Sequence, residues 1–243
     1  MRKLILFLSV VATGLFLTSC LKTGDSNFSG QREFFYITQL EGTQVAHNGG
    51  FAMTSNEIKT KEPDRWYRIS WSWSTENGMA STNVHNAMVS EIEQIPFGTY
   101  LQQEAPQEPI TPFLTFNMVK GLPISASFGD FLIIQYEWNK KEGETVQAKL
   151  YGNTDQPGAL DTYTLELRLE KSGTSTGTSG KTVEGFAAFG MGSLRNLISF
   201  NGQDFKDIQL KFNYYKGNSG QLTSVTHPVR VYKNCVWLLV IDH

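Results

Sequence analysis

Residues 163–169 read Tyr-Thr-Leu-Glu-Leu-Arg-Leu, and this stretch decides the predicted fold. Apolar side chains occupy every second position from Tyr163 to Leu169, and polar side chains lie between them. A period of two is typical of a β-strand that buries one face and exposes the other. The same alternation recurs at 132–138 and at 208–214. The sequence therefore predicts an all-β fold built from half-buried strands.

Other segments extend this pattern along the chain. Further strands are predicted at 33–40, 51–54, 66–73, 113–119, 146–151, 185–189 and 229–241. Pairs such as Asn48-Gly49 and Asn201-Gly202 supply the positive φ angles that tight reversals between strands require. Residues 84–92 fit a helical spacing as well as an extended one, and we predict a strand because no N-terminal capping box precedes them.

Composition restricts the classes of function. The chain has 243 residues, of which 40% are hydrophobic and 18% charged, and a net charge of −2. This length allows one or two domains with cores of their own. Basic residues near Trp66 and Tyr67 are interleaved with acidic ones, so no nucleic-acid partner is expected.

The N-terminus has the features of an export signal. Arg2 and Lys3 precede an almost unbroken apolar run at 4–17, which is too short to span about 30 Å of hydrocarbon. The run ends in Leu-Thr-Ser-Cys at residues 17–20, which resembles the lipobox of bacterial lipoproteins. That motif predicts lipidation of Cys20 and anchoring to a membrane through the lipid. The alternatives are an ordinary signal peptide or a buried helix with a chance cysteine.

Two neighbouring features bear on the compartment. Leu21 stands where an aspartate would predict retention in the inner membrane, so we predict the outer membrane, with the periplasmic and surface faces both open. Once Cys20 is acylated, Cys235 is the one remaining thiol and cannot form an intramolecular disulfide. Its apolar neighbours predict a small core residue rather than a reactive thiol.

Proline marks a predicted domain boundary. Residues 104–112 contain three prolines, which remove backbone donors and favour extended structure. A second irregular segment at 172–182 consists of Ser, Thr, Gly and one Lys, and is predicted to be a mobile loop between two strands. The predicted division is a signal peptide at 1–19, a tether at 20–30, an OB-like β domain at 31–103, a linker at 104–112 and a β-sandwich at 113–243.

Several motifs together resemble the NigD-like lipoproteins. They are the lipobox, Phe-Leu-Ile-Ile at 131–134, Leu-Glu-Leu-Arg at 165–168, and Phe189 followed by Ser-Leu at 193–194. The resemblance covers about residues 31–243 and implies a small N-terminal OB-like β-barrel followed by a C-terminal β-sandwich, with no established activity. The family pattern continues after the arginine with His-Asn, where this chain has Leu-Glu.

Motifs for catalysis or metal binding are weak. The four histidines are scattered without ligand spacing, so no metal and no cofactor is expected. Ser175 fits the letters of a nucleophile elbow, but more Ser, Thr and Gly follow it instead of a helix. Glu91 and Glu93 would point the same way from a strand about 6.6 Å apart, and we expect a solvated face there. The chain is not expected to be an enzyme.

Two functions from different classes remain. The first is a non-enzymatic protein-interaction module of the cell envelope, which predicts an exposed apolar or edge-strand patch. The alternative is a glycan-binding module, which predicts two or three exposed, roughly coplanar rings. Trp66, which points away from the Tyr67 face of its strand, and Tyr215 are the candidate ligand-binding residues.

Overall fold

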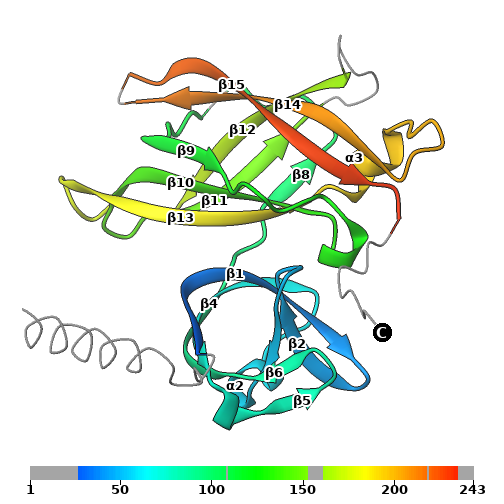
Figure 1. The fold of residues 1–243 in the computed structure, drawn as a ribbon. Helices are drawn as coiled ribbons and strands as arrows, with labels where there is room; N and C mark the ends of the chain where they lie inside the picture. The colour runs from blue at the N-terminus through cyan, green and yellow to red at the C-terminus, as the bar shows by residue number, and fades with distance from the viewer. Residues whose placement is uncertain (1–26, 108, 153–160, 218, 235–243) are drawn as a thin grey trace, which may run out of the picture.

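The protein is described by a computed structural model, which covers residues 27–107, 109–152, 161–217 and 219–234 (Figure 1). Within these residues, three sheets account for most of the structure. The helical elements are short: α2 (Asn56–Lys59), α3 (Gly192–Leu197) and the 3-10 turns η1 (Thr75–Asn77) and η2 (Ala126–Phe128). The prediction of an all-β fold is confirmed.

One seven-stranded sheet forms what we call the N-terminal unit, residues 28–94. Its strands lie in the order β5-β6-β3-β2-β1-β4-β7. Their bounds are β1 Phe28–Leu40, β2 Thr43–His47, β3 Ala52–Thr54, β4 Arg65–Trp73, β5 Met79–Ser81, β6 Val84–Asn86 and β7 Met88–Gln94. The sheet curls around its core (Figure 1). Among the described residues no pairing joins the edge strands β5 and β7.

The other two sheets pack face to face, and we call them the sandwich. The smaller sheet has the order β13-β10-β9 and the larger has the order β15-β14-β12-β11-β8. Their bounds are β8 Thr99–Leu101, β9 Thr115–Met118, β10 Phe131–Lys141, β11 Thr145–Tyr151, β12 Thr162–Ser172, β13 Gly180–Gly190, β14 Phe205–Lys216 and β15 Gln221–Tyr232. The described C-terminal strand thus ends at Tyr232, and residues 235–241 of the predicted strand lie outside the described residues.

The alternation in β12 works as the sequence predicts. Tyr163, Leu165, Leu167 and Leu169 are at most 3% exposed and belong to the core between the two sheets. β12 lies parallel to β14, with Leu165 opposite Phe212. The apolar face of one strand therefore adds to the apolar face of the next, which is how a sandwich core is assembled.

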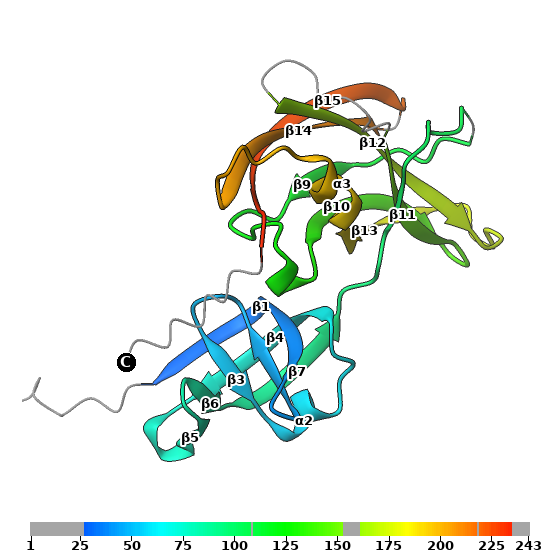
Figure 2. The same ribbon diagram turned by 90° about the vertical axis from the view of Figure 1, so that its right-hand side faces the viewer.

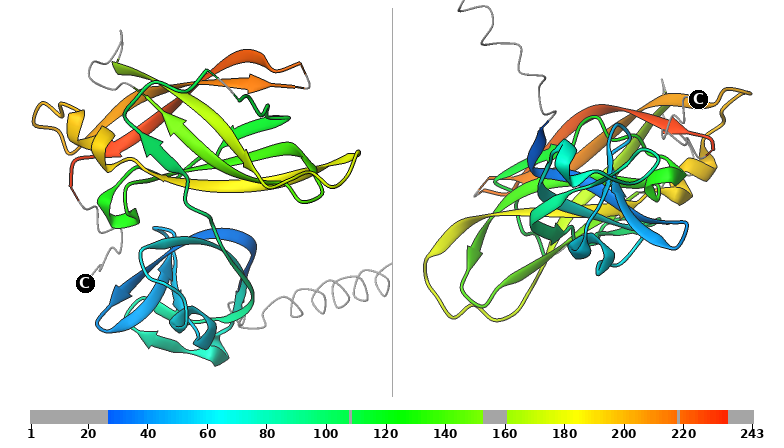
Figure 3. Two further views of the ribbon diagram at one scale, coloured as in Figure 1. Left: turned by 180° about the vertical axis from the view of Figure 1, so that it is seen from behind. Right: turned by 60° about the horizontal axis from the view of Figure 1, so that its bottom comes forward.

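The prediction of extended rather than helical structure at 84–92 is confirmed. The segment is divided into two strands, β6 and β7, because the buried Ala87 between them turns its N–H to the carbonyl of Thr54 at 3.0 Å. The Pro-rich segment at 104–112, by contrast, does not connect the two units. β8 precedes it and already pairs with β11 of the sandwich, so the chain crosses between the units at residues 95–98 (Figure 3).

The Ser/Thr/Gly tract does connect two strands, β12 and β13, and it packs against the turn between β10 and β11. Thr176 donates its N–H to the carbonyl of Glu142 at 3.0 Å. Gly143 and Gly173 have φ angles of +79° and +83°, and a Cβ on either would collide with a backbone carbonyl of the facing segment. Glycine is therefore required at both positions for this close approach.

Candidate functional site

Trp66 is not exposed, so the premise of its predicted ligand role is wrong. It is 0% exposed and stacks on Phe128 with ring centroids 5.6 Å apart. Its Nε1–H donates to the carbonyl of Phe128 at 3.3 Å. The sequence showed that Trp66 points away from the core of its own sheet. It could not show that η2 of the sandwich covers that second face.

Tyr215 lies on β14 of the sandwich, whereas Trp66 lies on β4 of the N-terminal unit. It is partly buried, and the guanidinium of Arg168 lies 4.4 Å from the centroid of its ring. Arg168 is itself 7% exposed and donates from Nη2 to the carbonyl of Pro106 at 3.0 Å. One face of the tyrosine is therefore occupied, and the structure does not bring the two predicted rings together.

The two units meet through an apolar contact with residues from both. Tyr36 and Trp66 come from the N-terminal unit, and Phe128, Ile133 and Ala188 come from the sandwich. Each is at most 4% exposed. This contact holds the units in one arrangement, in which the middle of β1 faces η2 and β10 (Figure 2).

His47 at this contact makes stability depend on pH. Its ring lies 5.0 Å from that of Phe128, and burial lowers the pKa of His47 to about 4 from its ordinary 6.5. The folded state holds the neutral ring, so the unfolded chain binds more protons between these two values. Stability from this group is thus present above pH 6.5 and is lost as the pH falls towards 4.

We expect wild-type protein to lose about 1–3 kcal/mol more than His47→Phe when the pH falls from 7 to 4.5. Urea unfolding of both proteins at the two pH values measures the difference. Equal losses in the two proteins would show that His47 does not titrate in the contact.

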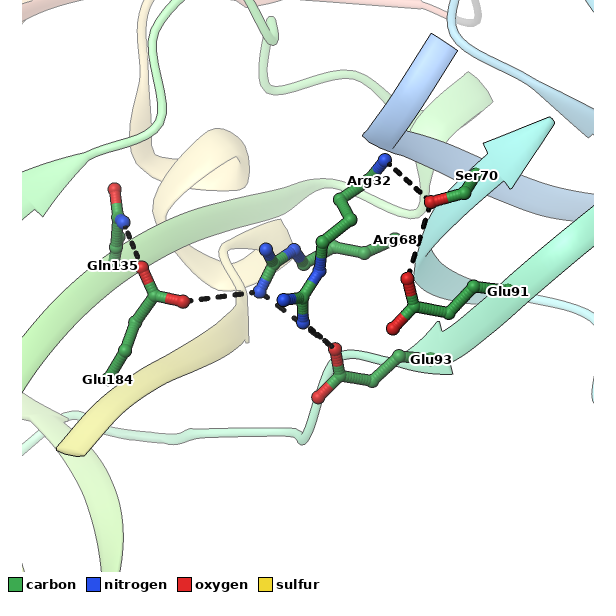
Figure 4. Close-up of polar contacts among 7 residues, drawn as sticks. All are labelled: Arg32, Arg68, Ser70, Glu91, Glu93, Gln135 and Glu184. Carbon is green, nitrogen blue, oxygen red and sulfur yellow. Dashed lines mark hydrogen bonds and ion pairs between the residues drawn. The ribbon is translucent and has the colours of Figure 1, made fainter.

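A charged cleft of about 240 Å³ opens beside this contact. Its polar residues come from β1, β4 and β7 of the N-terminal unit and from β10 and β13 of the sandwich (Figure 4). Arg32, Arg68, Glu93 and Glu184 line the cleft, and hydrogen bonds join Ser70, Glu91 and Gln135 to them (Figure 4). We call these seven residues the charged cleft.

A bulge in β1 positions Arg32 over the charged cleft. The register between β1 and β4 shifts between Gly30 and Glu33, and Arg32 has a φ of 51°, which is uncommon for a residue with a side chain. The N–H of Arg32 donates to Oγ of Ser70 at 3.1 Å, and that hydroxyl donates to Glu91 at 3.3 Å. The buried serine therefore fixes the bulge from below.

Arg68 ties the two units together. Its side chain is 11% exposed, and its guanidinium carbon lies 4.1 Å from the centroid of the Phe186 ring. Its Nη1 is 3.5 Å from Glu184 of the sandwich and 3.9 Å from Glu93 of β7. Gln135 donates to the other oxygen of Glu184 at 2.6 Å. Arg68 is thus part of the framework of the cleft.

Arg32 and Glu93 form the solvent-accessible part of the charged cleft. Nη2 of Arg32 lies 2.8 Å from Oε2 of Glu93, and the two side chains are 46% and 54% exposed. This hydrogen bond raises the pKa of Arg32, so the guanidinium stays charged. Glu91 and Glu93 point the same way from β7, as predicted, and both are exposed, but arginine and serine occupy part of the face expected to be solvated (Figure 4).

A second, more apolar groove of about 680 Å³ lies between β15 and residues 118–123. β15 is an edge strand of the larger sheet, and Pro228 within it removes one backbone donor. Burial and the charge of Lys120 lower the pKa of His227, whose Nε2 is buried without a hydrogen-bond partner. An edge strand beside an apolar groove is the kind of surface that the protein-interaction hypothesis predicts.

Metal sites and membrane-spanning helices can be assessed only for the described residues. In the ranges that the structure describes, no group of His, Cys, Asp and Glu is arranged to hold a metal ion. None of the helices in those ranges has the length and apolar character needed to cross a bilayer. Cys20, predicted to carry the lipid, and Cys235, predicted to be a core residue, lie outside the described residues.

No pattern in the sequence predicts the charged cleft. Arg68 was visible only as one of several basic residues near Trp66, and Glu184 lies 116 residues further along the chain. No periodicity within one strand reveals an ion pair between two units. The non-glycine bulge at Arg32 left no recognisable signal in the sequence.

Comparison with models of known protein families gives no match, and comparison with curated proteins gives none. Solved structures do match. A "putative lipoprotein" from Bacteroides fragilis NCTC 9343 matches with a TM-score of 0.55 and 11% identity, over 87% of this chain and 100% of that one. An uncharacterized protein from Parabacteroides merdae ATCC 43184 matches with a TM-score of 0.59 and 9% identity, over 83% and 98%.

A NigD-like immunity protein from Bacteroides caccae ATCC 43185 is also among the similar structures, with a TM-score of 0.49 and 10% identity, over 83% of this chain and 92% of that one. At these identities the likeness extends to the fold and not to an activity. The chain therefore shares the all-β fold of a set of Bacteroides and Parabacteroides proteins.

Proposed function

We propose that the chain is a non-enzymatic lipoprotein of the bacterial outer membrane, anchored through Cys20, which binds another protein at the charged cleft. The observation that carries the binding site is the Arg32–Glu93 pair, held at a bulge beside the contact between the two units. The anchoring is supported by the signal and lipobox at residues 1–20, and by Leu21 after the cysteine.

The cleft suits a partner that presents both signs of charge. The guanidinium of Arg32 is held by one carboxylate and is nearly half exposed, so it has donors to offer to a partner's carboxylate. Glu91 is exposed and accepts from Ser70, which leaves acceptor sites for a partner's lysine or arginine. Such charges at a rim fix orientation and association rate more than affinity.

The chemistry of the cleft favours binding over catalysis. Ser70 is 2% exposed, and its hydroxyl both accepts from the N–H of Arg32 and donates to Glu91. It therefore supports the bulge and does not face the cleft as a nucleophile. The carboxylates of Glu93 and Glu184 are held by the two arginines, an arrangement that positions charge without freeing a base.

Charge reversal tests this proposal. A photo-cross-linking amino acid at Gln94, an exposed residue lining the cleft, is placed in otherwise wild-type protein, in Arg32→Glu and in Arg230→Glu. Arg230 is the matched control, because its ion pair with Asp207 has the same 2.8 Å length and the arginine is also 46% exposed. We expect one specific cross-linked protein in intact cells, at least tenfold weaker in Arg32→Glu and unchanged in Arg230→Glu.

Two outcomes would contradict the cleft as the binding site. One is an equal cross-link in Arg32→Glu. The other is a loss in Arg230→Glu instead, which would move the contact to the groove beside β15. The glycan hypothesis has lost its predicted pair of exposed rings, since Trp66 is buried and Arg168 occupies one face of Tyr215. Dose-dependent binding of residues 21–243 on a glycan array would restore it.

A further inference from the structure

Four strand ends meet at one end of the N-terminal unit and expose apolar side chains there. β1, β5 and β7 begin at this end and β4 finishes there. Phe28, Met79 and Met88 are 52%, 49% and 64% exposed, and Trp73, on which Phe28 stacks, is 9% exposed. We call these four residues the apolar end. Figure 2 shows the start of β1 and β5 on the same side of the unit.

Ring contacts join part of the apolar end into one surface. The Phe28 ring stacks on that of Trp73 at 5.7 Å, and Trp73 meets the ring of His85 edge-on at 4.5 Å. His85 pairs in register with Met79. Nε1 of Trp73 donates to the carbonyl of Gly78 at 2.9 Å, which holds the start of β5 against this ring. The exposed side chains of Phe28 and Met79 therefore rest on a fixed aromatic layer.

Met88 lies at the same end, at the start of the neighbouring edge strand. It pairs with Ser72, the residue before Trp73, so its side chain points to the face of the sheet opposite that of Trp73. Exposed single apolar residues are common on proteins, but three at one end of a sheet are of the kind that marks a contact.

The length of the preceding chain limits where this patch can lie. Seven residues lie between Cys20 and Phe28, and the eight steps along an extended chain reach at most about 29 Å. A lipid on Cys20 is held at the membrane surface. Phe28, the first residue of β1, is therefore confined close to that surface.

We propose that the apolar end rests on the lipid surface, with Phe28, Met79 and Met88 entering the interfacial layer. This inference relies on the proposed anchoring through Cys20. A patch this small binds a bilayer weakly by itself. A short tether, however, holds it at an effective concentration on the order of millimolar, so weak contact suffices to orient the protein.

The charges nearby predict which lipids matter. Glu76, in η1 between β4 and β5, is exposed beside the patch, and it would be repelled by anionic headgroups. The contact is therefore apolar and independent of anionic lipid. The contact also fixes the distance of the charged cleft from the membrane. Arg68 lies five residues before Trp73 in β4, which is roughly 17 Å along the strand.

Quenching by brominated lipid tests the contact in the full processed lipoprotein. The protein is reconstituted in phosphatidylcholine vesicles with or without bromine on the acyl chains, and the ratio of tryptophan emission is measured. We expect clear quenching in the wild type, absent from Trp73→Phe and at least halved in Phe28→Ser/Met88→Ser. The matched control is Leu197→Ser/Leu222→Ser, whose leucines are 46% and 55% exposed on the sandwich, and it should quench as the wild type does.

Flotation of the same vesicles separates the two claims. Protein that floats but is not quenched, or is quenched equally in Phe28→Ser/Met88→Ser, overturns the contact while leaving the anchor in place. Protein that does not float overturns the anchor and the contact with it. Quenching that rises severalfold when anionic lipid is added would also contradict the apolar contact proposed here.

Discussion

Replacing Trp66 by alanine is expected to lower the free energy of unfolding by about 3–5 kcal/mol, the range for truncation of a large buried aromatic. Trp66 is 0% exposed and has two ring neighbours, Phe128 across the contact between the units and Tyr36 within its own sheet. The alanine variant leaves a cavity there and removes the hydrogen bond to the carbonyl of Phe128. Urea unfolding at pH 7 measures the loss.

Two further variants make this result specific. Trp66→Phe keeps a ring and removes the hydrogen bond, so a smaller loss of about 1–2 kcal/mol is expected. Phe205→Ala, an aromatic that is 39% exposed on the sandwich, should cost less than about 1 kcal/mol. A Trp66→Ala protein with unchanged stability would mean that the two units do not pack through this residue, and would restore Trp66 as a surface ligand platform.

The sequence predicted those parts of the fold in which one strand carries the whole signal. In β12 the alternation of Tyr163 to Leu169 alone is enough to assign the buried face. The same alternation does not predict the burial of Trp66. A period of two shows which side chains share a face of the sheet, but it does not show what covers the other face. Burial of that face depends on η2, which lies about sixty residues away in the sequence.

Proline content was a poor guide to the domain boundary for a related reason. Residues 104–112 avoid regular pairing, as three prolines require, but the segment lies on the sandwich, where the carbonyl of Pro106 accepts from Arg168. The crossing itself uses residues 95–98, where the N–H of Gly98 donates to the carbonyl of Ala188. A Cβ at Gly98 would meet the ring of Phe189, so this connection is short and tightly packed.

The charged cleft is the clearest case of information that the sequence does not carry locally. Glu91 and Glu93 were visible as a pair on one strand face. Their arginine partners come from a bulge in β1 and from β4, and Glu184 comes from the other unit. Ion pairs between distant segments follow from how the sheets pack, and a period of two or 3.6 residues contains no trace of them.

Changing Cys20 to alanine is expected to abolish anchoring. A lipid on this cysteine would supply about 0.8 kcal/mol for each buried CH₂, so two or three chains would hold the protein to its membrane. Without the thiol, no chain can be attached, and we expect an unprocessed precursor or soluble protein with no incorporation of a labelled fatty acid. Fractionation of cells measures the change. Cys235→Ala is the matched control and should label and fractionate as the wild type does.

Mass spectrometry of the N-terminal peptide from membrane-extracted protein distinguishes a lipidated N-terminus from an unprocessed one. We expect a chain that begins at Cys20, with a diacylglycerol in thioether linkage to its sulfur. A peptide that begins at Met1, or a Cys20 that carries a free thiol, would contradict it.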